Sequence, residues 1–226
     1  MAFSGFPAGG LAFLRALDQH NERGWFEAHR RSWDEEVVPA LLEWCGELTE
    51  RMRDAMPRLS FVPRPGGSVL HLNRDVRFSR DKRPYEPRAS ALLWEGEEKH
   101  DAPCLLLQIA PGEVTFTGGL PVFEEARIDR YRKLLLDGAA VARLEGALAQ
   151  AGKEGLRVQA PKLPRPPRGF DPAGPLAELS KLMGLSLVKK AKPGAWLHTR
   201  EALDRSEAAA RAYAPLHAWL RDELCA

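Results

Sequence analysis

The sequence contains little cysteine. Three cysteines, Cys45, Cys104 and Cys225, are spread over 226 residues, and no C-x-x-C pair occurs. An odd number at such wide spacing argues against a disulfide framework and against a zinc site built from cysteines. The six histidines show no H-x-x-x-H or H-E-x-x-H spacing. The sequence therefore predicts no metal site and no cofactor.

Long apolar runs are also missing. None approaches the roughly 18 residues that a membrane-spanning helix needs. Residues 1–10 have neither the basic segment nor the apolar segment of a signal peptide. We therefore expect a soluble, cytoplasmic protein without a membrane partner.

Recognisable catalytic motifs are absent from the sequence. It has no G-x-S-x-G nucleophile elbow and no G-x-x-x-x-G-K-[ST] phosphate-binding loop. The sequence accordingly assigns no catalytic residue and leaves open whether the protein is an enzyme. It also leaves the oligomeric state open.

The chain carries little net charge. Its 33 basic residues oppose 31 acidic residues, which leaves a formal charge of +2. Non-specific binding of nucleic acid needs several phosphate contacts, so this balance argues against nucleic acid as a partner. Any basic patch must be local.

What is present is the composition of an ordinary globular protein, with 44% hydrophobic and 28% charged residues. A chain of this length suits one domain, 1–226. We expect it to comprise a helical part, a strand-rich core and a mixed, mainly helical part, at residues 1–56, 57–120 and 121–226.

Helical spacing dominates the first part. Leu11, Leu14 and Leu17 form one apolar stripe, and a second stripe follows Val38. Asn21 is a plausible cap of a short second helix, and Ser32–Glu35 has the form of a capping box. Asp137 and Thr199 are expected to cap two later helices.

Strand patterns follow. Val69–Asn73 alternates apolar and polar residues, and Pro111-Gly112 separates the strand-like runs Cys104–Ile109 and Val114–Thr117, which predicts an antiparallel hairpin. Gly118-Gly119 allows a close backbone approach, to a ligand or to another segment. The expected fold class is α+β: a central, mainly antiparallel sheet with the N-terminal helices packed on it and a helical C-terminal end.

The densest polar segment is Arg74–Glu86, which we call the arginine-rich loop. It holds five cations, three carboxylates and the aromatic residues Phe78 and Tyr85 within thirteen residues. Loops that a scaffold holds in place often carry function. We expect Phe78 and Tyr85 to anchor the loop by burial.

The loop is the candidate binding site for a small anion, because an arginine fork holds phosphate or carboxylate through two parallel bonds. The candidate ligand-binding residues are His71, Arg74, Asp75, Arg77, Arg80, Asp81, Lys82 and Tyr85. We expect at least two of its cations to share a cleft: Arg74, Arg77, Arg80 and Lys82. Two alternatives stay open: a nucleic-acid- or nucleotide-associated protein, and a structural ion-pair network without a small-molecule site.

The loop sequence R-D-x-R-F-S-[KR]-D-K-x-P-Y resembles the signature of the uncharacterised family called domain of unknown function 2461. Further similarities lie at Asn21 with Trp25 and Phe26, at Gly118-Gly119 and at Pro167–Phe170. The resemblance covers most of the chain. His71 stands where the family is expected to have arginine, and Glu86 where it is expected to have lysine, so the positive charge is diluted here. The resemblance implies a shared fold, and it implies no particular activity.

Overall fold

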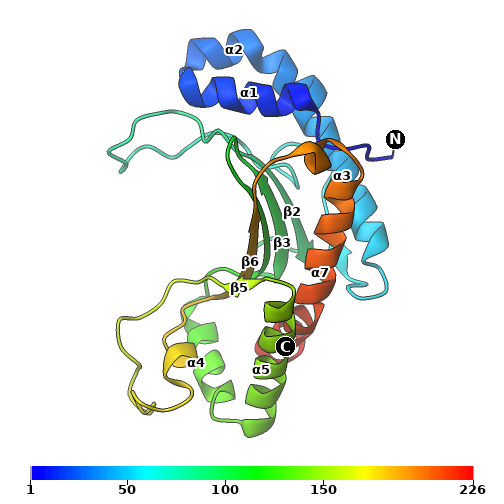
Figure 1. Cartoon of the computed structure of the whole chain (residues 1–226). Helices are drawn as coiled ribbons and strands as arrows, with labels where there is room; N and C mark the ends of the chain where they lie inside the picture. Colours follow the sequence, from blue (N-terminus) through cyan, green and yellow to red (C-terminus); the bar gives the residue numbers. More distant parts are fainter. Residues whose placement is uncertain (1, 226) are drawn as a thin grey trace. The chain divides into compact units, whose positions relative to one another are not determined.

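The computed structural model describes residues 2–225 (Figure 1). The chain folds into two compact units. Unit 1 comprises residues 2–93, Leu106–Phe116 and Lys190–Ala208, and unit 2 comprises Trp94–Leu105, Thr117–Lys189 and 209–225. The single-domain organisation expected from the sequence stays a prediction.

Six strands form one antiparallel sheet in the order β1-β2-β3-β4-β6-β5. Their bounds are β1 Leu59–Ser60, β2 Ala89–Glu95, β3 Cys104–Ile109, β4 Val114–Leu120, β5 Arg157–Val158 and β6 Leu185–Ala191. β3 and β4 form the predicted hairpin, with Ala110 N–H donating to the Glu113 carbonyl at 2.9 Å. β5 pairs antiparallel with β6, with Arg157 opposite Val188. The expected α+β fold class is confirmed.

Helices precede and follow the strands. Their bounds are α1 Ala8–Gln19, α2 Arg23–Ser32, α3 Val38–Arg51, α4 Glu125–Leu134, α5 Gly138–Lys153, α6 Ala177–Ser180 and α7 Glu201–Trp219. Shorter helical turns lie at Trp33–Val37, Ala195–His198 and Leu220–Leu224. The predicted cap of α5 is confirmed, because the Asp137 carboxylate accepts the amides of Ala139 and Ala140.

Two expected caps are wrong. Ser32 has helical backbone angles, φ −63° and ψ −36°, because α2 continues through a π-helical turn into α3. A capping serine needs an extended backbone, so no capping box forms there. The residue before α2 is Glu22, which makes no side-chain cap, and Asn21 does not cap this helix.

The core of unit 1 lies between α3 and the sheet. Trp44 of α3 and Leu107 of β3 line one cavity of about 10 Å³, a space no larger than one water molecule needs. The indole N–H of Trp44 donates to Ser206 Oγ on α7 at 2.9 Å. Burial of these apolar side chains is what holds α3 against this part of the sheet.

The core of unit 2 is built around Tyr131 of α4, which is fully buried. Its ring centroid lies 5.2 Å from that of Phe123 and 6.3 Å from that of Trp219 on α7. The Tyr131 hydroxyl donates to the Leu179 carbonyl at 3.1 Å, and the Trp219 indole donates to the Ala140 carbonyl at 3.0 Å. These bonds satisfy the polar ends of the two buried rings.

The glycine pair on β4 allows a close approach to other segments of unit 2. A Cβ added at Gly118 would lie 2.4 Å from the Tyr213 ring. Gly119 has φ +147°, and a Cβ there would lie 2.3 Å from the Leu185 carbonyl oxygen. The sequence left open whether a ligand or another segment approaches this glycine pair. The structure shows that other segments pack against it.

We expect Gly118→Ala to lower the free energy of unfolding by about 1–3 kcal/mol, because the added methyl group would overpack against a buried ring. Denaturant titration measures the loss. The matched control is Gly146→Ala within α5, where an added Cβ meets nothing within 4 Å. Alanine favours a helix over glycine by about 0.5–1 kcal/mol, so the control should gain stability. Equal stability of both variants would contradict the packing described.

In the described part of the chain, no helix has the length and apolar character to cross a membrane. Likewise, among residues 2–225 no group of three or more His, Cys, Asp or Glu side chains is placed to hold a metal ion.

Candidate anion site at the arginine-rich loop

The base of the arginine-rich loop is closed by backbone pairing. Asn73 and Tyr85 form an antiparallel bridge, and Arg74 N–H donates to the Pro84 carbonyl at 2.9 Å. The strand predicted at Val69–Asn73 is wrong. This segment makes a single bridge to Ala91 at Val69 and then turns to pair with Tyr85 at Asn73, so no continuous ladder forms.

Tyr85 anchors the loop to the helices of unit 1. Its side chain is buried, and its ring stacks on Phe26 of α2 with the centroids 4.5 Å apart. Asn21 holds the Tyr85 backbone from both sides: its amide donates to the Tyr85 carbonyl, and its side-chain oxygen accepts the Tyr85 N–H, each at 3.0 Å. This clamp takes the place of the helix cap that the sequence predicted for Asn21.

Phe78 does not anchor the loop. Its side chain is 95% exposed, so the expectation that it is buried is wrong. The nearest cation is its neighbour Arg77, whose guanidinium carbon lies 5.9 Å from the ring centroid. The loop leaves the protein surface between its base and Phe78, so no apolar neighbour covers the ring.

Ion pairs inside the loop occupy both of its aspartates. Asp75 accepts a forked pair of bonds from Arg77, which lowers the pKa of the Asp75 carboxyl. Asp81 accepts from Arg74 at 2.7 Å, and this bond, with the Arg83 backbone N–H, holds the pKa of Asp81 well below its usual range. Both carboxylates therefore stay ionised at neutral pH.

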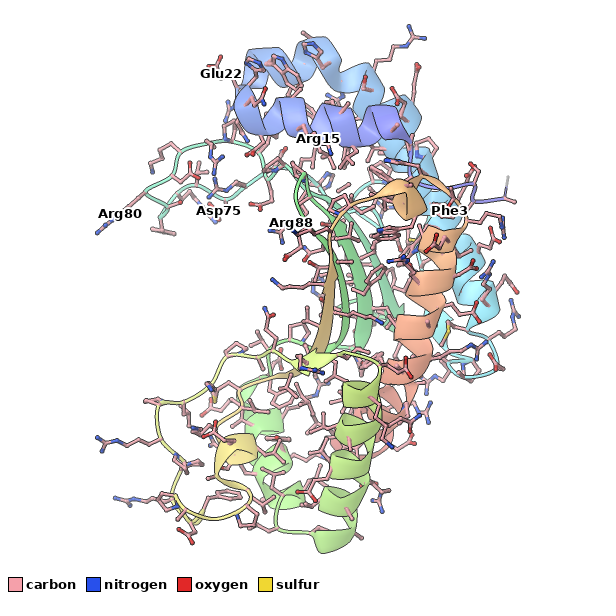
Figure 2. The ribbon with its side chains drawn as sticks, in the orientation of Figure 1. Phe3, Arg15, Glu22, Asp75, Arg80 and Arg88 are labelled. Atoms are coloured by element: carbon pink, nitrogen blue, oxygen red, sulfur yellow. The ribbon has the colours of Figure 1, made fainter. Side chains whose placement is uncertain are left out.

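The other candidates are dispersed. Figure 2 shows Arg80 at the outer end of the loop, where its exposed side chain makes no ion pair or hydrogen bond with any residue in 2–225. The Lys82 ammonium donates to the Val76 carbonyl at 3.0 Å. His71 lies before the loop, where its ring packs close to Gly66.

A surface depression of about 460 Å³ lies beside the base of the loop. We call it the arginine depression. It is lined by Asp18, Arg74, Arg83, Glu86, Pro87, Arg88, Ala110, Pro111 and Gly112, all in unit 1. Among the four cations expected to share a cleft, only Arg74 lines this depression. The structure adds Arg83, Arg88 and Asp18.

Carboxylates hold the three guanidinium groups of the arginine depression in place. Arg83 donates to Asp18 at 3.2 Å, and Arg88 pairs with Glu86 at 3.2 Å. Arg88 also donates to Gln108 of β3 at 3.2 Å. Within residues 2–225, Nη2 of Arg74 and Nη2 of Arg83 donate no hydrogen bond to the protein. These donors remain for solvent or a ligand.

Sequence reasoning missed the added residues for different reasons. Arg83 belongs to the loop and was among its five cations, but nothing in the sequence separates it from Arg80. Arg88 follows the loop by two residues. Asp18 is contributed by α1, more than fifty residues earlier in the chain, and no local signal indicates its approach to Arg83.

The fold and site together define an α+β protein in which a tyrosine-anchored, arginine-rich loop borders an open depression. Residues 10–219 match the conserved hypothetical protein family DUF2461, and the chain belongs to that family. Neither the curated proteins nor the solved structures gave a match to this chain.

Proposed function

We propose that the protein binds a small ligand bearing a phosphate or carboxylate group in the arginine depression. The observation that carries the proposal is the convergence of three guanidinium groups on one depression, where the lining holds two carboxylates, Asp18 and Glu86. The lining residues alone thus carry one net positive charge, and Asp81, which pairs with Arg74 and Arg83 from outside the lining, brings the local balance to zero. Charge-assisted bonds from an arginine fork are among the stronger hydrogen bonds that a protein offers.

The proposal gives the candidate residues different roles. Arg74 contacts the anion, together with Arg83 and Arg88. Asp81 holds Arg74 and Arg83 in position, and Tyr85 fixes the loop. The proposal assigns no catalytic residue, and the cytoplasmic location expected from the sequence stays a prediction.

A purely structural ion-pair network predicts a different response to added anions. Exposed ion pairs each contribute roughly 0–1 kcal/mol to stability, and a network of them would leave anions without a preferred site. The response of the protein to added phosphate separates the two possibilities.

We expect inorganic phosphate to stabilise the folded protein by RT ln(1 + [L]/Kd), which is about 2.7 kcal/mol at a hundredfold excess over Kd. The melting temperature is measured against phosphate concentration at constant ionic strength. The double variant Arg83→Ala, Arg88→Ala should lose most of this gain, because both guanidinium groups line the arginine depression.

The matched control is the double variant Arg77→Ala, Lys82→Ala, which removes two cations of the same loop that do not line the arginine depression. It should keep the gain. Phosphate also stabilises proteins non-specifically by exclusion from their surface, so equal gains in wild type and both variants would refute an anion site. Loss confined to the Arg77, Lys82 variant would move the site to the loop itself.

A further inference from the structure

The outer part of the arginine-rich loop, Val76–Lys82, is a second feature of the same segment, and we call it the loop tip. It presents Phe78 with its ring 95% exposed. The loop tip carries three cations, of which Arg77 lies beside the ring and pairs with Asp75, and the other two are Arg80 and Lys82. Among the described residues Arg80 and Lys82 have no carboxylate partner: the Arg80 side chain makes no bond, and Lys82 donates to a backbone carbonyl. The loop tip therefore offers one aromatic face and two cations without a carboxylate partner, while its other charged residues, Arg77 and Asp81, form ion pairs.

Two hydrogen bonds link residues within the loop tip. Ser79 N–H donates to the Val76 carbonyl at 3.4 Å, and the Lys82 ammonium reaches the same carbonyl across the loop. At the base, Tyr85 is clamped by Asn21 and stacked on Phe26. These contacts connect the loop tip to an anchored base.

We propose that the loop tip binds single-stranded nucleic acid, with a base stacked on Phe78 and adjacent phosphates bound by Arg80 and Lys82. Proteins that bind single strands without sequence preference combine an aromatic side chain, on which a base stacks, with cations that follow the backbone. The loop tip supplies both elements within five residues.

The same chemistry argues against duplex DNA. Bases in a duplex are stacked on one another, so their faces are not available to a protein ring, and recognition by stacking is directed at unpaired bases. The nearly neutral chain offers few further cations for a duplex backbone. Duplex DNA should therefore bind much more weakly than a single strand.

A protein partner fits the loop tip less well. A stable interface buries roughly 800 Å² on each partner, whereas this site is a seven-residue convex tip with one aromatic ring. The proposal also stands apart from the anion site, because neither Phe78 nor Arg80 nor Lys82 lines the arginine depression.

The test is fluorescence anisotropy with labelled oligo-dT and oligo-U of about 15 nucleotides, near the upper site size of single-strand binding folds, in low salt. We expect saturable binding by the wild type. Loss of one stacked base should weaken the Kd about 10- to 100-fold in Phe78→Ala, and Phe78→Trp should bind at least as tightly as the wild type. Phe78 is exposed, so these variants should keep the wild-type unfolding midpoint.

The cations are tested by salt dependence. Two phosphate contacts to a single strand predict a slope of log K against log salt of about −1.4. Arg80→Ala, Lys82→Ala should bring this slope close to zero. The matched control is Lys133→Ala, Lys153→Ala, which removes two exposed lysines of α4 and α5 and should keep the wild-type slope.

Three outcomes would overturn the proposal. They are no saturable binding of either oligonucleotide by the wild type in low salt, a wild-type Kd for Phe78→Ala, and equal binding of the matched duplex. Concentration-dependent self-association that Phe78→Ala abolishes, without oligonucleotide binding, would instead assign the loop tip to a contact with a second copy of the chain.

Discussion

Tyr85→Ala is expected to lower the free energy of unfolding by about 3–5 kcal/mol, the usual cost of removing a large buried aromatic side chain. The ring is buried, and it stacks on Phe26 at a centroid distance of 4.5 Å. Without it, α2 loses a packing partner and the base of the arginine-rich loop loses its anchor.

The measurement is a urea titration of Tyr85→Ala beside Phe78→Ala. These two aromatic residues lie seven positions apart in the same loop, but Phe78 is 95% exposed. Exposed substitutions usually change stability by less than about 0.5 kcal/mol, so Phe78→Ala should unfold like the wild type. A loss above 2 kcal/mol in Phe78→Ala, or below 1 kcal/mol in Tyr85→Ala, would contradict this arrangement.

The contrast between these two rings shows what the loop sequence alone does not determine. Both are aromatic residues in one polar segment, and the sequence predicts burial for each. Burial is decided by Asn21 and Phe26, which clamp and cover Tyr85 from about sixty residues away in the chain. The sequence of Arg74–Glu86 alone does not indicate these contacts.

Features with local causes were predicted well. The hairpin of β3 and β4 follows from Pro111-Gly112 between two apolar runs, and the Asp137 cap follows from its own side chain and the next amides. The Ser32 box failed because the following turn is π-helical and continuous with α3. There the packing of a long helix prevailed over a local capping pattern.

The candidate site likewise combines features with local causes and features that depend on distant segments. The Asp75–Arg77 ion pair joins residues two positions apart in the sequence. This part of a structural ion-pair network can therefore be predicted from the local sequence. The arginine depression depends on Asp18 from α1 and on the β3–β4 turn, including Pro111 and Gly112. Its composition could not be predicted before these segments were placed together.

A buried acid–base pair in unit 2 escaped sequence analysis completely. His217 of α7 is 1% exposed and Glu95 at the end of β2 is 7% exposed. Nε2 of His217 lies 2.6 Å from Oε2 of Glu95. No local pattern in the sequence relates Glu95 to His217, because the two residues are separated by 122 positions.

The residues around this pair offer the His217 ring few other polar contacts. The Tyr213 ring stands edge-on to the His217 ring at 5.5 Å, and burial raises the pKa of Tyr213 well above its usual value. His217 Nδ1 is buried and has no hydrogen-bond partner among the described residues. The bond to Glu95 is therefore the principal polar contact of the His217 side chain.

His217→Ala is expected to lower the free energy of unfolding by about 3–5 kcal/mol, because breaking a buried, hydrogen-bonded pair by removing one member is strongly destabilising. Denaturant titration of His217→Ala, Glu95→Ala and the double variant measures the coupling. The double variant should lose less than the sum of the single losses, since the two side chains contact each other directly and their losses are coupled. Arg31→Ala is the matched control. Arg31 pairs with Glu35, and the two side chains are 84% and 59% exposed, so this substitution should cost less than about 1 kcal/mol. Additive losses, or a cost for His217→Ala no greater than that of Arg31→Ala, would show that the buried pair does not stabilise unit 2.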